Sequence, residues 1–147
     1  MLKFVVYGAA APKGSMRAFV PKGWTRPILT SATKGLKAWE AKIAAAAGTQ
    51  ANGVLLTEPL IVAIDFYLPR PKSLKTGSLP HTKRPDLDKL IRGATDALTG
   101  IIWKDDAQAV TITASKFYVV TQNEAPRAEF TIRTLDETGH TRPSAAT

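Results

Sequence analysis

Four aspartates lie close together in the sequence, in a pattern that could hold a divalent cation. Asp86 and Asp88 are separated by one residue, and Asp105 and Asp106 are adjacent. Carboxylate oxygens suit Mg²⁺, which keeps several of its own waters and therefore needs only two or three such ligands. A cation held in this way beside a phosphate diester polarises the phosphate and lowers the pKa of an attacking water. The pattern therefore indicates metal-assisted phosphodiester hydrolysis.

The same four aspartates also fit a purely structural interpretation. Asp86 is a favoured helix cap, Asp88 is an acid in a first helical turn, and the later pair suits a polar turn before a strand. A helix between the two pairs would separate them by about 18 Å at 1.5 Å per residue. They can converge only if segment 101–104 and the strand after it run back alongside that helix. Spacing alone leaves both interpretations open.

The helix between the two pairs is predicted from the spacing of its apolar residues. It starts after Pro85 and is stopped by Gly100. Its apolar face consists of Leu87, Leu90, Ile91, Ala94, Ala97 and Leu98. Its polar face consists of Asp88, Lys89, Arg92, Thr95, Asp96 and Thr99. Asp96 is interpreted as a surface acid or a hydrogen-bond partner rather than a ligand.

An earlier helix is predicted over Ala32–Ala47, with Ser31 or Thr33 as its cap and Gly48 as its end. Its apolar stripe consists of Leu36, Trp39, Ile43 and Ala47. The strands predicted from β-branched, aromatic and alternating runs are Leu2–Tyr7, Leu60–Leu68, Ala109–Val120 and Arg127–Thr134.

These elements predict an α+β fold. The order βαβαββ favours a mixed or mainly antiparallel sheet with two helices on one face. The last two strands are expected to form a hairpin through residues 121–126. Residues 1–134 are predicted to form a single domain, and the polar tail 135–147 is expected to be disordered.

Composition excludes several classes of site. The 147 residues include no cysteine and two histidines, which removes disulfides, thiolate zinc sites and cysteine nucleophiles and disfavours a histidine metal cage. No apolar stretch approaches the roughly 20 residues of a membrane span, so we expect a cytoplasmic protein that does not bind membranes. A net charge of +8 and a pI near 9.9 favour a polyanionic partner such as nucleic acid.

The basic residues gather in two acid-free stretches, Gly8–Thr30 and Pro69–Pro85, which are rich in glycine or proline. Both are interpreted as loops on a folded scaffold, a setting that suits contacts with phosphates. The residues predicted to bind DNA are Lys13, Arg17, Lys22, Arg26, Arg70, Lys72, Lys83 and Arg84, together with Lys89 on the second helix.

The segment from His81 to Gln108, followed by Lys116, resembles the signature of the RusA family of Holliday-junction resolvases. The shared features are a basic-Pro-Asp-Leu-Asp opening, an Asp-Ala-Leu helix end and an Asp-Asp-x-Gln turn that leads into a strand bearing a lysine. The resemblance implies a homodimeric, Mg²⁺-dependent endonuclease acting on branched DNA, with Mn²⁺ as a possible substitute. It also implies the metal ligands Asp86, Asp88 and Asp106, with Asp105 beside them. Since the family is common in bacteria and their phages, it suggests a phage or prophage origin.

Two positions depart from the family pattern. Lys89 stands where the family has an asparagine, and it places a positive charge near the predicted metal. Arg92 replaces a lysine; it could steady Asp88 or a phosphate, but it cannot donate a proton at neutral pH. The alternative for Arg92 is an exposed arginine in a weak ion pair.

Lys116 lies on the same side of its predicted strand as Val110, Ile112 and Ala114, where a charge is costly unless it reaches a partner. We interpret it as an active-site or DNA contact; the alternative is a lysine that reaches out to solvent at the strand end. The predicted catalytic set is therefore Asp86, Asp88, Asp106, Arg92 and Lys116. Two other functions stay open: a nuclease of broader branched-DNA specificity, and a DNA-binding protein that does not cut.

Overall fold

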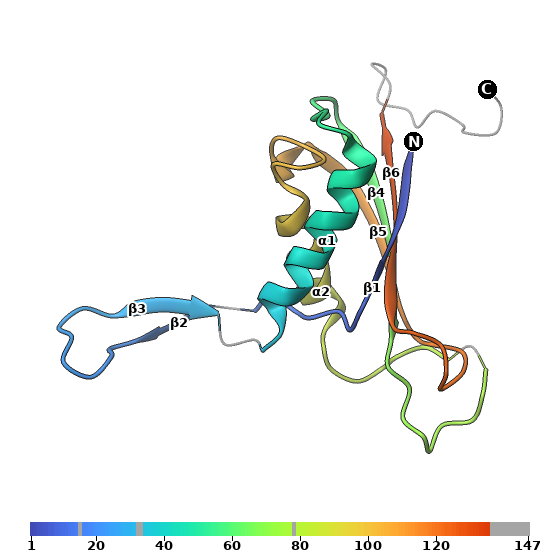
Figure 1. Ribbon diagram of the computed structural model, residues 1–147, viewed down its shortest axis with the longest axis horizontal. Coiled ribbons are helices and arrows are strands. Elements are labelled where there is room, and N and C mark those ends of the chain that lie inside the picture. Colours follow the sequence, from blue (N-terminus) through green and yellow to red (C-terminus); the bar gives the residue numbers. More distant parts are fainter. Residues whose placement is uncertain (15, 32–33, 78, 136–147) are drawn as a thin grey trace.

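The computed structural model describes residues 1–14, 16–31, 34–77 and 79–135. One sheet is formed by β1 (Leu2–Tyr7), β4 (Leu60–Leu68), β5 (Ala109–Tyr118) and β6 (Arg127–Thr134), in the order β1-β6-β4-β5 (Figure 1). Strand β6 is antiparallel to both β1 and β4, whereas β5 is parallel to β4. The sheet is therefore mixed, and the predicted α+β class is confirmed.

The predicted hairpin of the last two strands is wrong, because β4 lies between β5 and β6. Parallel neighbours need a crossover connection rather than a tight turn, and helix α2 (Leu87–Leu98) provides it between β4 and β5. Strand β5 starts beside the C-terminal end of α2 and runs back to its N-terminal end. The strand after α2 thus does return alongside the helix, as convergence of the aspartates would require.

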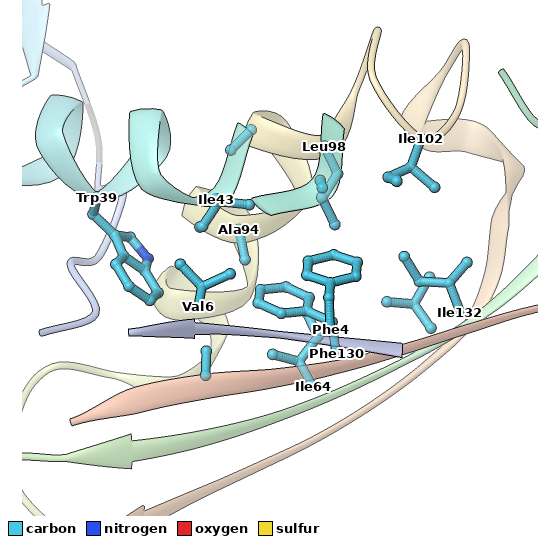
Figure 2. Close-up of a cluster of buried hydrophobic side chains, with 14 of the residues drawn as sticks. Phe4, Val6, Trp39, Ile43, Ile64, Ala94, Leu98, Ile102, Phe130 and Ile132 are labelled. Carbon is cyan, nitrogen blue, oxygen red and sulfur yellow. The ribbon is translucent and has the colours of Figure 1, made fainter. Parts of the chain in front are cut away.

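Helices α1 (Leu36–Ala51) and α2 cover one face of the sheet (Figure 1), as predicted. Figure 2 shows Ile43 of α1 and Leu98 of α2 packing toward Phe4 and Phe130 of the sheet. These two phenylalanines are partners in neighbouring strands, and their rings stack with centroids 4.8 Å apart. Each fully buried side chain of this size contributes about 1.5–3 kcal/mol, so the shared core fixes both helices on the sheet.

Helix α1 is displaced from its predicted range by four residues at each end. Its cap is Gly35, with φ 81°, and its C-cap is Asn52, with φ 50°, whose N–H donates to the Gly48 carbonyl at 3.2 Å. Gly48 lies inside the helix instead of ending it. Ala51 continues the buried stripe one turn beyond Ala47, so the helix extends through Gly48 although a helical glycine costs about 1 kcal/mol relative to alanine. Ser31 belongs to the preceding strand, and Thr33 lies outside the described residues.

The basic stretch Gly8–Thr30, predicted as a loop, contains a β-hairpin instead. Strands β2 (Met16–Phe19) and β3 (Ile28–Ser31) pair antiparallel with each other and form their own two-stranded sheet. Their four-residue lengths are too short to show an alternating pattern among flanking prolines and glycines. We call residues 16–31 the arm, because they project away from the helices and the main sheet (Figure 1).

The segment between β1 and the arm packs closely on α2. The Lys13 N–H donates to the Lys89 carbonyl at 3.0 Å, and Ala11 is buried. A Cβ added at Gly93 would lie 3.0 Å from the Ala11 carbonyl oxygen, so this close approach needs glycine. The segment therefore brings the base of the arm to the N-terminal half of α2.

Of the predicted tail 135–147, only Leu135 is described, and its N–H donates to the Pro59 carbonyl at 2.9 Å. Residues 136–147 lie outside the described residues. Across the described ranges, the longest helices are too short or too polar to span a membrane.

Candidate functional site

The N-terminal end of α2 carries the first aspartate pair. Asp86 is the N-cap residue, with an extended backbone (φ −69°, ψ 142°), but its side chain makes no capping hydrogen bond. Asp88 lies in the first turn, and both side chains are exposed. The capping interpretation therefore accounts for the position of Asp86 but not for its carboxylate, whose oxygens remain open to other partners.

Basic residues surround this pair. The Lys89 ammonium lies 3.5 Å from the Asp86 carboxylate, and both side chains are about half exposed, so the ion pair contributes little to stability. Asp86 also borders a cavity of about 590 Å³, whose other charged lining residues are Lys34, Arg84 and Lys89. One acid among three cations suits a phosphate group better than a neutral ligand.

Lys116 connects the returning strand β5 to this end of α2. In the sheet it is the partner of Phe66, on the face that the helices cover. Its ammonium donates to the Lys83 carbonyl at 2.7 Å and to the Pro85 carbonyl at 2.8 Å. The charge thus reaches polar partners within the fold, and it holds the backbone that leads directly into Asp86.

The C-terminal end of α2 is organised differently. Asp105 caps the short 3-10 helix η1 (Asp106–Gln108), accepting a hydrogen bond from the Ala107 N–H at 2.9 Å. The Gln108 side chain accepts from the Asp105 N–H at 2.9 Å and donates to the Leu56 carbonyl at 2.8 Å. This capping box accounts for two residues of the Asp-Asp-x-Gln turn in structural terms.

Asp106 belongs to the same end of the helix. One carboxylate oxygen accepts hydrogen bonds from the Thr99 hydroxyl and from the Trp103 indole N–H, the latter at 3.0 Å. Thr99 is the C-cap of α2, whereas Asp86 is its N-cap, so the 12-residue helix separates Asp106 from Asp86 by about 18 Å. Among the described residues, no three His, Cys, Asp or Glu side chains converge in an arrangement that could hold a metal ion. One copy of the chain therefore brings Asp86 and Asp88 together and leaves Asp105 and Asp106 apart from them.

Two of the predicted DNA-binding residues serve the fold. The Lys13 ammonium donates a hydrogen bond to the Asp96 carboxylate of α2, with 2.9 Å between Nζ and Oδ2. This hydrogen bond raises the pKa of Lys13, although burial of the ammonium lowers it. Asp96 is thus a hydrogen-bond partner, as interpreted above. Arg70 is buried, with its guanidinium donating to the Gly77 and Val119 carbonyls at 2.7 Å each. Its burial corrects the prediction of a surface contact, because the guanidinium instead ties Gly77 to Val119, just after β5.

The remaining predicted DNA-binding residues whose side chains are described lie at the surface. They are Lys22 and Arg26 in the arm, Lys72, Lys83 and Arg84 in the segment before α2, and Lys89 in α2. Arg92 is also exposed, and the ion pairs found in the described part of the chain do not include one between Arg92 and Asp88. For Arg17, the structure describes the backbone, within β2.

Two residues near the site carried no signal in the sequence. Lys34 lies about 50 positions before the aspartates, and only the fold brings it to their cavity. His81 lies in the stretch Pro69–Pro85, outside any helix or strand, and its ring packs against Tyr118 with centroids 4.5 Å apart. Burial and the neighbouring Lys116 charge lower the pKa of His81, which makes it a neutral side chain at the edge of the site.

Comparison with known proteins adds independent information. A sequence model of the family described as "Endodeoxyribonuclease RusA" matches residues 10–133, which include the arm, α2 and both aspartate pairs. A Bacillus subtilis (strain 168) protein described as "Uncharacterized protein YqaN" is 32% identical over 142 residues, covering 90% of this chain and 95% of that relative.

Proposed function

We propose that this chain, which belongs to the RusA family of endodeoxyribonucleases, resolves four-way DNA junctions by metal-dependent hydrolysis of phosphodiesters. The observation that carries the proposal is the Asp86–Asp88 pair. These two exposed carboxylates lie at the head of α2, beside a cavity of about 590 Å³ with three basic residues in its lining. An acid pair in such surroundings suits a cation that is shared with a phosphate.

The donor set fits Mg²⁺, with Mn²⁺ as a substitute. Mg²⁺ is commonly held by one or two carboxylates together with waters and a substrate phosphate, and Asp86 and Asp88 can supply the carboxylates. Asp86 is suited to this role because its side chain makes no capping bond, and its ion pair with Lys89 at 3.5 Å is weak. The bound cation would polarise the scissile phosphate and activate a water.

The chain's own residues would orient the DNA. Lys116 fixes the backbone before Asp86 through two carbonyls. Arg84 and Lys34, on the cavity wall, would bind phosphate oxygens next to the cut. Arg92 is four residues after Asp88 and would stabilise negative charge on the reacting phosphate, without acting as a proton donor.

A homodimer follows from the reaction, because symmetric resolution requires two cuts of opposed polarity and therefore two equivalent active sites. The dimer also offers a place for Asp106. Within one copy this residue is about 18 Å from Asp86, so the ligand role that the family pattern gives it requires the Asp106 of a second copy. We assign each active site to Asp86 and Asp88 of one copy and Asp106 of the other.

The test is cleavage of a labelled four-way junction in Mg²⁺ or Mn²⁺, with EDTA as the blank. The wild type should make paired symmetric nicks, and Asp88→Asn should lose them while still binding the junction. Asp65→Asn is the matched control, because Asp65 is exposed on the sheet face away from the helices and, within the described residues, its side chain accepts a hydrogen bond from Ser115 alone, at 2.6 Å. Equal processing of flaps and forks would indicate a nuclease of broader specificity.

One observation favours an alternative, a junction-binding protein that does not cut. The Lys89 ammonium, 3.5 Å from the Asp86 carboxylate, competes with a metal ion for that ligand. Tight binding without cleavage by the wild type would support this alternative. Lys89→Asn, which restores the family residue, should then produce metal-dependent nicks if the lysine is what blocks the reaction.

A further inference from the structure

The tip of the arm holds an aromatic side chain in solvent. Trp24 is 58% exposed, whereas the other two tryptophans, Trp39 and Trp103, are buried. The Trp24 N–H donates to the Pro21 carbonyl at 2.9 Å, and Gly23 has φ +86°, which is the conformation that a type II turn needs at its third position. The turn therefore presents the indole ring outward, and no core lies at the tip to bury it.

The same tip is positively charged. Lys22 and Arg26 each lie two residues from Trp24, and both are exposed. The first acidic residue of the whole chain is Glu40, so nothing in the arm offsets these charges. An exposed ring between two cations matches a nucleic acid, whose bases offer flat faces and whose phosphates offer negative charge.

The arm leaves the body of the protein at the candidate active site. Pro12 before it and Lys34 after it line the same cavity as Asp86, and the arm extends outward from there (Figure 1). An extended chain covers at most about 3.3–3.6 Å per residue, so Lys22 lies within about 30 Å of Lys13. That distance corresponds to roughly nine base pairs, and the tip and the aspartates can therefore contact one DNA molecule.

We propose that the arm recognises the branch point of the DNA, with Trp24 stacked on a base face exposed there and with Lys22 and Arg26 on the flanking phosphates. This inference rests on the proposed function for the identity of the substrate. In a continuous duplex each base face is covered by its neighbours, whereas a branch point interrupts the stack. Trp24 therefore favours branched over linear DNA, while the two cations strengthen binding to both.

The experiment compares binding of a four-way junction and a linear duplex of the same sequence by the full chain in EDTA. Junction binding should quench tryptophan emission, and the change should come from Trp24 because the other two indoles are buried. Trp24→Ala should abolish the quenching and weaken junction binding by about 5- to 100-fold, with duplex binding changed by less than about twofold.

Matched variants at the same tip isolate stacking from charge and from folding. Trp24→Tyr keeps a stacking ring and should retain most of the junction affinity. Val20→Ala removes another exposed apolar side chain, 55% exposed, and should change neither affinity. Lys22→Ala should weaken binding to both DNAs alike and reduce the salt dependence by about one phosphate contact. All four variants should melt like the wild type, because these side chains are exposed.

For a wild type that binds the junction, three results would overturn the proposal: unchanged junction affinity in Trp24→Ala, an equal loss on duplex and junction, or a lower molecular mass of Trp24→Ala in sedimentation. The last would show that the arm holds a second copy of the chain. If the wild type cleaves the junction and Trp24→Ala binds it normally, the role of the arm is rejected and the proposed nuclease activity stands. Quenching and junction preference without cleavage would reject the nuclease and leave the arm as a branch-point reader. A wild type that binds neither DNA would reject both.

Discussion

The two ends of helix α2 carry the same acidic side chains and use them in different ways. At the N-terminal end, Asp86 and Asp88 are exposed, and the Asp86 side chain caps nothing. At the C-terminal end, Asp105 caps η1, and Asp106 accepts hydrogen bonds from Thr99 and Trp103. A carboxylate that already accepts from protein donors is partly committed to the fold. The N-terminal pair, whose described contact is the weak ion pair of Asp86 with Lys89, is therefore better suited to bind a cation.

The surroundings of the two ends of α2 also differ. The N-terminal end lies beside a basic cavity that is open to a polyanion, and Lys116 steadies its backbone. The C-terminal end is a closed turn, which Gln108 ties to the carbonyls of Leu56 and Glu58. Under the proposed function, the N-terminal end would bind the cation and the phosphate, whereas the hydrogen bonds of the C-terminal end hold a turn, although the sequence pattern of paired acids is similar at both.

The same substitution at both ends is the strongest test of this comparison. Asp86→Asn should lower single-turnover junction cleavage by about 100-fold or more, since metal-assisted charge stabilisation amounts to several kcal/mol. Its melting temperature should not change, because the side chain is exposed. Asp106→Asn keeps an oxygen acceptor for Trp103 and should also fold normally, and the RusA pattern predicts an equally large loss of cleavage. Wild-type cleavage by Asp106→Asn would mean that this carboxylate serves only the turn.

Mixing the two inactive variants sharpens the result. In a dimer whose sites take Asp86 from one copy and Asp106 from the other, a mixed dimer has one intact site and one doubly substituted site. A 1:1 mixture with free exchange should then regain about one quarter of the wild-type sites, as single nicks. Sites made within one copy would regain nothing. A mixture of Asp86→Asn with Asp88→Asn is the control. Asp86 and Asp88 come from the same copy, so every site of the mixed dimer carries one substitution and no cleavage should return.

Helix α2 and its aspartate pair could be predicted because the information is local. The apolar residues recur with a helical period, and a cap and a glycine mark the two ends. The orientation of Lys116 was also local, since alternation within one strand puts it on the covered face. Each of these inferences uses residues that are neighbours in sequence as well as in space.

The features that could not be predicted depend on distant contacts. The sequence of β5 does not indicate whether it pairs with β4 or with β6. The pairing with β4 results from the crossover connection through α2. The strands of the arm are too short for periodicity to distinguish them from a loop. Lys34, just before α1, and Asp86, at the start of α2, line the same cavity, and the fold brings them there by packing α1 against α2. The capping box at Asp105, by contrast, has a recognisable spacing to Gln108 and could have been found.

A smaller effect is expected from loosening the N-terminal end without touching its acids. Lys116→Met keeps the length and apolar stem of the side chain but removes the hydrogen bonds to the Lys83 and Pro85 carbonyls. We expect a loss of about 1 kcal/mol in the free energy of unfolding, measured by urea denaturation, and a partial loss of cleavage as Asp86 moves. Lys104→Met, at an exposed position near the other end of α2, should change neither quantity. Equal effects of both substitutions would indicate a general role of surface charge.

The smallest effect should be a pH dependence of stability that comes from His81, in the segment before α2. Burial and the Lys116 charge lower the pKa of His81, so the unfolded chain, with a pKa near 6.5, binds this proton more readily than the folded chain. The contribution of His81 to stability is then complete above pH 6.5 and declines as the pH falls from there toward the folded-state pKa. His81→Phe keeps a ring against Tyr118 but cannot titrate. Its urea midpoint should fall less than that of the wild type between about pH 7 and 5.5. Parallel curves for the two proteins would show that groups other than His81 control stability in this pH range.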